Sequence, residues 1–333
     1  MTHTLTSHQR VYRSVHFQTP DRLPIFMPAF GFEDFTWVTP HIPSEFITTG
    51  LGADEWGCVW EKTAVKNMGQ IRVHPLADWS ALDHYRFPDP ACAEAFAGFG
   101  EKLDRQAGKY ILFERFMLLF ERMHSLRGFA ATLEDLYAEP DRSAELADRI
   151  VEFNLRFLRH TATVAGNRIH AFYFTDDWGT QLAPFISRGL WQKFFKPRYA
   201  RIFAEAHALG WDVWMHSCGK ITDIIEDLIE IGVNVLNLQQ PRALGIEEIG
   251  RRYAGRVAFS SLCDIQATLP TGSRDRIRED ARLLLAHWAT PRGGFVVQDY
   301  HDAAAIGTSD EAKRIMFDAF REFDPWRKTG GAP

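Results

Sequence analysis

Two hydrophobic periods alternate along the second half of the chain. Short apolar runs give way to longer segments in which apolar residues recur every three or four positions. Short runs bounded by turn residues predict buried strands, and the longer period predicts amphipathic helices. The predicted strands cover 170–175, 211–217, 233–238, 256–262 and 293–298, and the helices cover 187–210, 220–232, 245–255, 273–289 and 309–323. This alternation predicts βα units with a parallel sheet.

The first half is less regular but adds further units. A helix is predicted over 7–18, a buried strand within 21–30, a short strand or turn at 54–60, a strand leading into a helix at 109–116, and helices at 132–140 and 143–166. Seven or eight βα units favour a closed barrel, because an open doubly wound sheet usually has a G-x-G-x-x-G turn, which this sequence lacks. We therefore predict one α/β domain over 1–333, a (β/α)8 TIM barrel with an N-terminal helical extension.

Composition and charge exclude several classes of protein. The 333 residues are 46% hydrophobic and 24% charged, as in a folded protein with a sizeable core. A net charge of -5 argues against a nucleic-acid partner, since phosphate contacts need clustered Lys and Arg. The chain has neither a signal peptide nor an apolar run of roughly 18 residues, so no membrane is expected. Four cysteines make no disulfide framework, which predicts a cytoplasmic location.

Polar residues at the ends of the predicted strands are candidates for chemistry, because active sites of such barrels lie at the carboxyl ends of the strands. His216 and Cys218 are two residues apart at one strand end and should face the same side. A catalytic zinc needs three ligands from His, Cys and carboxylate, with one position left open. His301, after the last strand, is the best placed third ligand, and Cys263 is the alternative.

Other interpretations of the same residues remain open. His-x-Cys is a weak motif, and a buried cysteine is common simply as a small hydrophobic residue. Asp176 and Asp177 would cap a helix, or else orient a substrate or a metal-bound water. Gln239 and Gln266 suit hydrogen bonding to a polar ligand or to loop backbone. Trp37 and Trp178 could line an aromatic pocket or belong to the core.

Several segments together resemble a known family. They are "PDRLPIF", "DEWGCVW", "HPLADW", "YRFPDP", "DDWGTQ", "FFKPRYARI", "HSCGK" and "DIQATLPTGSRDRIREDARLL". In this order, and over nearly the whole chain, they resemble the uroporphyrinogen decarboxylase superfamily, in its decarboxylase-like branch near the corrinoid-linked methyltransferases. The resemblance implies a single (β/α)8 barrel with its site at the carboxyl-terminal mouth.

The superfamily contains decarboxylases and methyltransferases, and this sequence lacks a motif of the decarboxylases. True decarboxylases carry an arginine-rich "RQAGR"-like segment after the first strand, where this chain reads "MPAFGFEDF". Without the guanidinium groups that would hold substrate carboxylates there, porphyrin decarboxylation is not expected. An aspartate such as Asp54 does not replace that anion clamp.

The methyltransferase branch binds zinc through His-x-Cys and a third ligand after the last strand, which implies Zn2+ on His216, Cys218 and His301. The methyl group of a small, aromatic methyl ether or related substrate would pass to a corrinoid (cobalamin) on a partner protein, or to a folate carrier. Catalytic candidates are Asp176, Asp177, Glu114 and Tyr300; substrate-binding candidates are Phe30, Trp37, Trp178, Gln239 and Gln266.

Two other functions remain as alternatives at this level. One is a metal-free decarboxylase or lyase of a small carboxylic acid, with Asp54 or Asp176 as its acid. The other is a non-catalytic protein that binds a tetrapyrrole or corrinoid. A homodimer is the commonest default for the oligomeric state.

Overall fold

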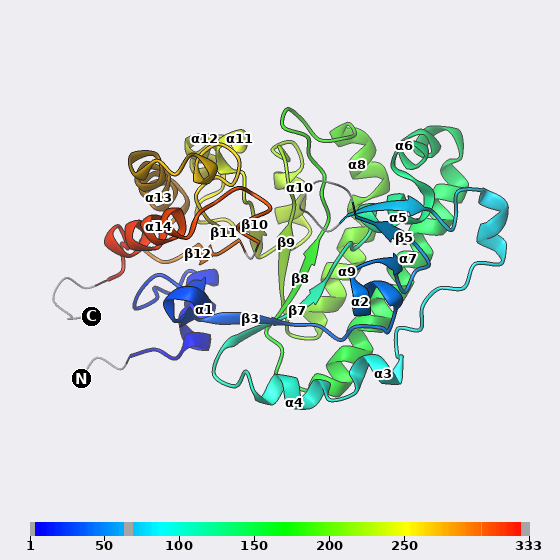
Figure 1. The fold of residues 1–333 in the computed structure, drawn as a ribbon, viewed down its shortest axis with the longest axis horizontal. Coiled ribbons are helices and arrows are strands. Elements are labelled where there is room, and N and C mark those ends of the chain that lie inside the picture. The colour runs from blue at the N-terminus through cyan, green and yellow to red at the C-terminus, as the bar shows by residue number, and fades with distance from the viewer. Residues whose placement is uncertain (1–3, 63–68, 301, 328–333) are drawn as a thin grey trace.

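Eight parallel strands form a nearly closed barrel (Figure 1) in the part of the chain that the computed structural model describes, residues 4–62, 69–300 and 302–327. The strands are β1 (Ile25–Met27), β3 (Phe35–Val38), β7 (Tyr110–Arg115), β8 (Ala171–Thr175), β9 (Asp212–His216), β10 (Val235–Asn237), β11 (Ala258–Ser261) and β12 (Phe295–Gln298). A short strand, β2 (Phe32–Glu33), pairs antiparallel with β1. The predicted TIM barrel is confirmed.

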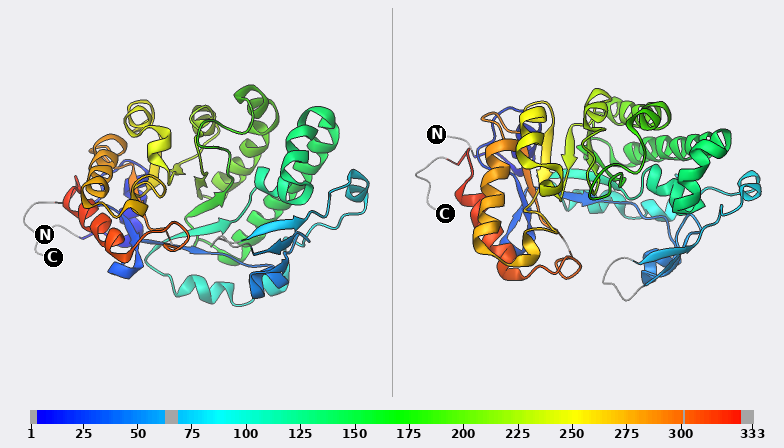
Figure 2. Two further views of the ribbon diagram at one scale, coloured as in Figure 1. Left: turned by 45° about the horizontal axis from the view of Figure 1, so that its top comes forward. Right: turned by 90° about the horizontal axis from the view of Figure 1, so that it is seen from above.

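Helices cover the outside of the barrel (Figure 2), with the carboxyl-terminal ones on one side of the strands and α5 to α9 on the other. The longer helices are α1 (Ser7–Val15), α5 (Phe120–Arg127), α6 (Phe129–Ala138), α7 (Pro140–Ala165), α8 (Arg188–Phe194), α9 (Lys196–Ala208), α12 (Ile246–Tyr253), α13 (Arg274–Trp288) and α14 (Asp310–Glu322). The shorter ones are α2 (Glu45–Thr49), α3 (Ala93–Phe96), α4 (Phe99–Asp104), α10 (Ile225–Glu230) and α11 (Pro241–Leu244). No helix in this described part combines the length and apolarity that a membrane crossing requires.

Alternate residues of each strand fill the barrel interior. Leu112 of β7 and Trp214 of β9 belong to an inner apolar cluster, which Val11 and Val15 of α1 join from the amino-terminal end. The predicted N-terminal helix therefore closes one end of the barrel. Because residues i and i+2 of a strand share a face, His216 points to the same side as Trp214, toward the interior at the opposite end.

The predicted helix over 187–210 is two helices in the structure. The backbone N–H of Phe195 donates to the carbonyl of Trp191 (2.8 Å) and ends α8, and Pro197 lies in the first turn of α9. Proline has no N–H, and its ring clashes with the preceding turn, so it kinks or breaks a helix, and here the helix is interrupted. The spacing of apolar residues alone does not reveal this break.

Two strand features were absent from the prediction. Strand β3 follows β1 without a helix: the chain turns back as β2 and reverses again at Asp34. A separate three-stranded antiparallel sheet contains β4 (Gly52–Ala53), β5 (Val59–Glu61) and β6 (Gln70–Val73). The prediction of a short strand or turn at 54–60 corresponds to a turn followed by β5.

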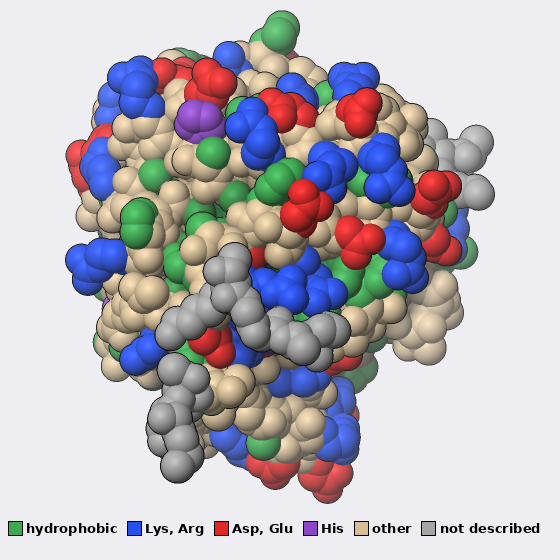
Figure 3. All heavy atoms as spheres, turned by 90° about the vertical axis from the view of Figure 1, so that its left-hand side faces the viewer, with side chains coloured by type: hydrophobic (Ala, Val, Ile, Leu, Met, Phe, Trp, Pro, Cys, Tyr) green, Lys and Arg blue, Asp and Glu red, His purple; other side chains and the backbone are tan. Residues whose placement is uncertain are grey.

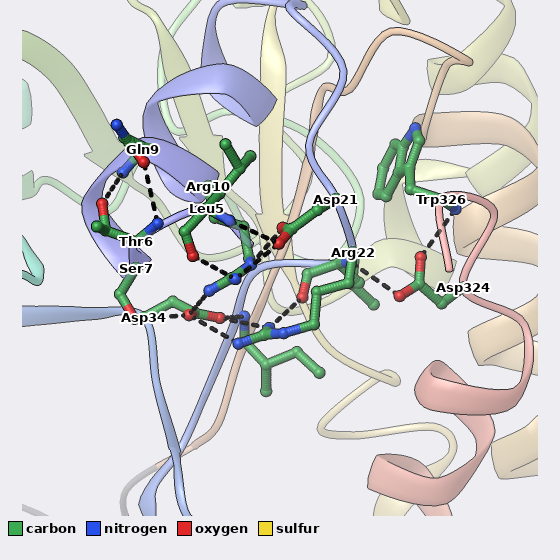
Figure 4. Close-up of polar contacts among 12 residues, drawn as sticks. Leu5, Thr6, Ser7, Gln9, Arg10, Asp21, Arg22, Asp34, Asp324 and Trp326 are labelled. Atoms are coloured by element: carbon green, nitrogen blue, oxygen red, sulfur yellow. Dashed lines mark hydrogen bonds and ion pairs between the residues drawn. The ribbon is translucent and has the colours of Figure 1, made fainter. Parts of the chain in front are cut away.

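A buried carboxylate organises the amino-terminal segment (Figure 4). Asp34, only 1% exposed, accepts hydrogen bonds from Arg10 (2.7 Å), from Arg22 (2.7 and 2.9 Å) and from the backbone of Ile25 (2.9 Å). Arg10 also pairs with Asp21 at 2.6 Å. Asp21 and Arg22 of the "PDRLPIF" segment therefore connect α1 to β1 and have a structural role.

The face formed by the carboxyl-terminal helices carries charges of both signs. Figure 3 shows acidic and basic side chains interspersed there. Arg278 of α13 and Glu322 of α14, for example, form an ion pair at 2.7 Å. Exposed pairs of this kind contribute at most about 1 kcal/mol each, so the packing of α13 against α14 depends mainly on buried apolar contacts.

Candidate metal centre

Three metal-binding side chains converge where β8 and β9 end. His216 is the last residue of β9, Cys218 follows two residues later, and Asp177 lies two residues beyond the end of β8. One ligand atom of each lies within 4.8 Å of the others. Nε2 of His216 is 3.4 Å from Sγ of Cys218 and 3.7 Å from Oδ1 of Asp177. An imidazole, a thiol and a carboxylate thus surround a space that one ion could share.

Hydrogen bonds around Asn237 fix the tautomer of His216. Nδ2 of Asn237 donates to the backbone carbonyl of Ser260 (3.0 Å) and to Oε1 of Gln298 (3.1 Å). A carbonyl oxygen only accepts, so the amide nitrogen of Asn237 must face Ser260 and its Oδ1 must face His216. This oxygen lies 2.7 Å from Nδ1 of His216. Nδ1 therefore carries the proton, and Nε2 directs its lone pair toward Cys218 and Asp177.

Replacing Asn237 with leucine should weaken metal binding while preserving the three donors. Loss of the partner that orients a histidine ligand typically lowers metal affinity about 10- to 100-fold. Zinc affinity would be measured by competition with a chromophoric chelator. Asn234→Ala is the control, because the Asn234 side chain accepts a hydrogen bond from the backbone of Val213 (2.7 Å), at the opposite end of β9 from His216. Unchanged affinity in Asn237→Leu would contradict the proposed orientation of His216.

Two glycines bring the loops after β8 and β9 into backbone contact. A Cβ atom on Gly219, whose φ is 79°, would lie 2.1 Å from the carbonyl oxygen of Gly179. The backbone N–H of Gly179 donates to the carbonyl of Cys218 (3.2 Å), and the backbone N–H of Cys218 donates to Oδ1 of Asp177 (2.7 Å). Only glycine permits this approach. The segments "DDWG" and "HSCG" therefore bring Asp177 to Cys218.

Burial and neighbouring charge control the protonation of the thiol at this centre. Burial, followed by the charge of Asp177, raises the pKa of the Cys218 thiol. A divalent ion reverses that shift, because it stabilises the thiolate that ligates it. Burial, followed by the charge of Cys218, likewise raises the pKa of Tyr300. His301, the next residue and the expected third ligand, lies outside the described residues.

Asp176 has a structural position, unlike its neighbour Asp177. It is fully buried, and its Oδ2 accepts from the backbone N–H groups of Leu119 (2.9 Å) and Phe120 (3.0 Å) and from the hydroxyl of Tyr199 (2.5 Å). Its Oδ1 accepts from the backbone of Glu121 at 2.6 Å. Burial raises the pKa of Asp176 to about 6, although these donors oppose the shift. The expected catalytic role is therefore corrected: Asp176 caps the amino-terminal end of α5 from inside the core.

Of two aromatic substrate-binding candidates, Trp178 belongs to the core and Phe30 packs against it. Trp178 has no exposed surface and stacks on Phe120 with ring centroids 4.1 Å apart. Its Nε1 donates to the hydroxyl of Tyr199 (2.9 Å). Phe30 stacks on Phe317 of α14, with ring centroids 4.6 Å apart. The expected role of Trp178 in a substrate pocket is corrected, because its ring is fully buried, whereas the role of the partly buried Phe30 stays a prediction.

Cys263 and Gln266 also lie away from the cluster. Cys263 is fully buried, and its thiol donates to the carbonyl of Ile277 in α13 at 3.2 Å. The side chain thus points to the outer helical layer, which removes it as the alternative third ligand. Gln266 is exposed, and its backbone N–H donates to Asp264 (2.9 Å), as in an ordinary loop.

The remaining candidates lie at the barrel mouth or in its interior. Gln239 is buried, and its amide donates to Oδ1 of Asn237 at 3.4 Å. The Trp37 ring packs edge-on against Tyr173, with centroids 5.8 Å apart. Glu114 accepts a hydrogen bond from Thr39 (3.3 Å), and burial raises the pKa of its carboxyl group.

Sequence reasoning missed Glu121. This buried carboxyl in α5 accepts from the hydroxyl of Thr175 (3.0 Å), and its pKa is raised by burial and then by the charges of Asp177 and Asp176. It therefore lies close to Asp177 of the candidate metal site. It belongs to a helix, so attention to strand ends alone did not find it.

Comparisons with known proteins agree with this architecture. The sequence model of the family described as uroporphyrinogen decarboxylase matches residues 116–323, well over half of the chain. The chain is similar in structure to a methyltransferase from Methanosarcina mazei, with a TM-score of 0.65 and 15% identity over 96% of this chain and 99% of the other. No curated protein sequence matches significantly.

Two other solved structures are more distantly similar. One is a glycosylated endo-beta-1,4-xylanase from Gloeophyllum trabeum, with a TM-score of 0.41 and 12% identity over 68% of this chain and 79% of the other. The second is a D-psicose 3-epimerase, with a TM-score of 0.36 and 11% identity over 68% of this chain and 91% of the other.

Proposed function

The chain belongs to the uroporphyrinogen decarboxylase family, and from that premise we propose that it is a zinc-dependent methyltransferase. Its substrate is a small methylated molecule, an aromatic methyl ether or a relative, and its acceptor is a corrinoid on a partner protein or a folate carrier. The proposal depends on one observation, the convergence of His216, Cys218 and Asp177 at the barrel mouth. The similarity in fold to a methyltransferase supports it.

The donor set fits zinc. Zn2+ in proteins takes nitrogen from His, sulfur from Cys and oxygen from carboxylate, and catalytic sites keep three protein ligands and one open position. His216, Cys218 and Asp177 supply one donor of each kind. Softer thiolate and imidazole ligands also favour zinc over magnesium or calcium. His301 stays a prediction for the third position, with Asp177 then orienting the substrate.

When bound, zinc would supply Lewis-acid stabilisation of the negative charge on the departing oxygen or sulfur. The chain's own residues prepare the site: Asn237 keeps Nε2 of His216 unprotonated, and the backbone of Cys218 holds the Asp177 carboxylate. Tyr300, with its pKa raised, stays protonated near neutral pH and can donate a hydrogen bond to the leaving atom. Gln239 and Glu114 offer polar contacts to the substrate.

Zinc analysis combined with a methyl-transfer assay tests the proposal. Purified protein should contain about one zinc per chain, as expected for a single tetrahedral site. With a set of methoxylated aromatic compounds as donors, chemically reduced cobalamin should become methylcobalamin, which is followed by absorbance. Removing the metal with a chelator should abolish the reaction, and zinc should restore it.

The same assay separates this function from the metal-free alternative. A decarboxylase or lyase would keep its activity after chelation, and a non-catalytic tetrapyrrole-binding protein would change the spectrum of a corrinoid without turnover. Sub-stoichiometric metal together with no methylcobalamin from any donor would reject the zinc methyltransferase.

A further inference from the structure

A second feature of the barrel mouth is a cavity of about 250 Å3 beside the ends of β3 and β7. Residues of α2, β5, β7 and α5 line it, elements that lie together in Figure 1. Its volume is slightly below that of typical ligand pockets, which run from about 300 to 1,000 Å3. The space therefore suits a small molecule or one end of a larger one.

Two buried arginines form one wall of this cavity. Arg115, the last residue of β7, is 7% exposed, and Arg122 of α5 is 2% exposed. Their guanidinium groups lie over the same indole ring, that of Trp56, at 5.6 and 4.7 Å from its centroid. This stacking fixes the planes of both groups, so the donors at their edges have defined directions.

Several of these donors have no acceptor among the described residues. Nε and Nη2 of Arg115 and Nε of Arg122 are buried without a hydrogen-bond partner. The carboxylate paired with Arg115 is Glu55, at 3.6 Å, and Oε1 of Glu55 also accepts from the indole of Trp56 (3.0 Å). Burial lowers the pKa of Arg115 to about 10, a sign of incomplete compensation.

Asp54, the partner of Arg122, likewise accepts hydrogen bonds from other groups. Its Oδ1 accepts from the backbones of Trp56 and Cys58 (both 2.9 Å), and its Oδ2 accepts from Trp60 and Arg122 (both 3.2 Å). A guanidinium has five N–H donors, and unmet buried donors cost about 1–3 kcal/mol each. A ligand that brings acceptor oxygens would recover part of this cost.

The rest of the lining indicates what accompanies those oxygens. Apolar side chains from α2, from β5, from the segment before α2 and from the residue after β7 complete the cavity: Ile42, Phe46, Ile47, Trp60 and Phe116. We propose that this cavity binds the carboxylate end of a small carboxylic acid with an apolar body, and that Arg115 and Arg122 hold the carboxylate. A planar fork of N–H groups matches a carboxylate in geometry.

This inference rests on the proposed function and specifies its substrate as a methylated carboxylic acid. Glu114 lines the cavity and pairs across the sheet with Tyr173 of β8. Tyr173 in turn pairs with Trp214 of β9, two residues before His216. Two strand spacings, about 10 Å, therefore separate the cavity wall from the strand that carries the metal cluster. In this proposal the carboxylate is held at the end of β7, and the methylated end of the acid is directed toward β9.

Calorimetric binding of matched acids and amides tests the assignment. The probes are benzoate, 4-methoxybenzoate and hexanoate with their primary amides, titrated into chelated and zinc-loaded protein. At least one acid should bind in both states, and its amide should bind about 10- to 100-fold more weakly, the range expected for hydrogen bonds to charged groups. Arg115→Lys keeps the charge but loses the fork and should weaken the acid about 10-fold.

A second substitution, at the rim of the cavity, tests the same site even if Arg115→Lys fails to fold. Ile47 is 44% exposed at the cavity, so Ile47→Trp should block entry and weaken the acid at least about 10-fold without disturbing the core. Val73→Trp is the control, at a 52% exposed position of β6 outside the lining. No binding by any acid, equal binding of acid and amide, or an unaffected Ile47→Trp would overturn the inference.

The two proposals fail in different ways in this experiment. Acid binding that survives in a protein unable to retain zinc or form methylcobalamin would reject the methyltransferase and support the carboxylate site. Zinc binding and methyl transfer without any acid binding would reject the carboxylate site alone.

Discussion

Replacing Cys218 with alanine is expected to lower zinc affinity by more than about 100-fold, beyond the loss that a ligand's hydrogen-bond partner causes, and to abolish methyl transfer. The thiolate is the softest of the three donors and contributes most to the preference for zinc. Without it, His216 and Asp177 remain, which is too few for a catalytic site. Metal content after gel filtration and a chelator competition would measure the loss.

Cys263→Ala is the matched control for this substitution. Cys263 is fully buried against α13, so its loss should leave zinc affinity unchanged, even if the small cavity costs some stability. Chelated Cys218→Ala should unfold within about 1 kcal/mol of the chelated wild type, since Cys218 belongs to neither hydrophobic core cluster of the described residues. Wild-type zinc affinity in Cys218→Ala would refute the metal centre as described.

The barrel was accessible from sequence because its carboxyl-terminal half repeats one simple unit. From β8 onward each strand is short and buried, and the longer helices carry an apolar stripe. The spacing of apolar residues and the length of each run therefore identify strands and helices. Strand β3 was not predicted, because it is connected to β1 by β2 and a reversal at Asp34 and not by a helix. Its pairing partner, β7, is distant in sequence, and local pattern contains no information on that pairing.

The candidate site was accessible only in part for a related reason. The period of two in a strand is local, so the common direction of His216 and Cys218 followed from their spacing. The approach of Asp177 depends on the contact between Gly179 and Gly219, a tertiary event. Arg115 and Arg122 become a pair only because both stack on Trp56 from a third segment.

The second large effect is expected at Asp176, where alanine should lower the free energy of unfolding by about 3–5 kcal/mol, because each buried donor left unsatisfied costs about 1–3 kcal/mol. The carboxylate accepts from three consecutive backbone N–H groups at 119–121 and from Tyr199. Alanine offers none of these acceptors and leaves each donor buried and unsatisfied. Urea denaturation, with an unchanged m-value, would measure the loss.

Asp177→Ala gives the contrast that makes this prediction specific to position. The neighbouring side chain is 38% exposed and accepts from the backbone of Cys218, so its loss should cost about 1 kcal/mol or less in the absence of metal. Chelator must be present for both variants, because bound zinc would add its own stabilisation to the wild type. Equal destabilisation by the two substitutions would contradict the division of roles, in which Asp176 holds α5 in place and Asp177 faces the ion. If Asp176→Ala instead kept full stability but lost activity, Asp176 would return to the list of catalytic residues.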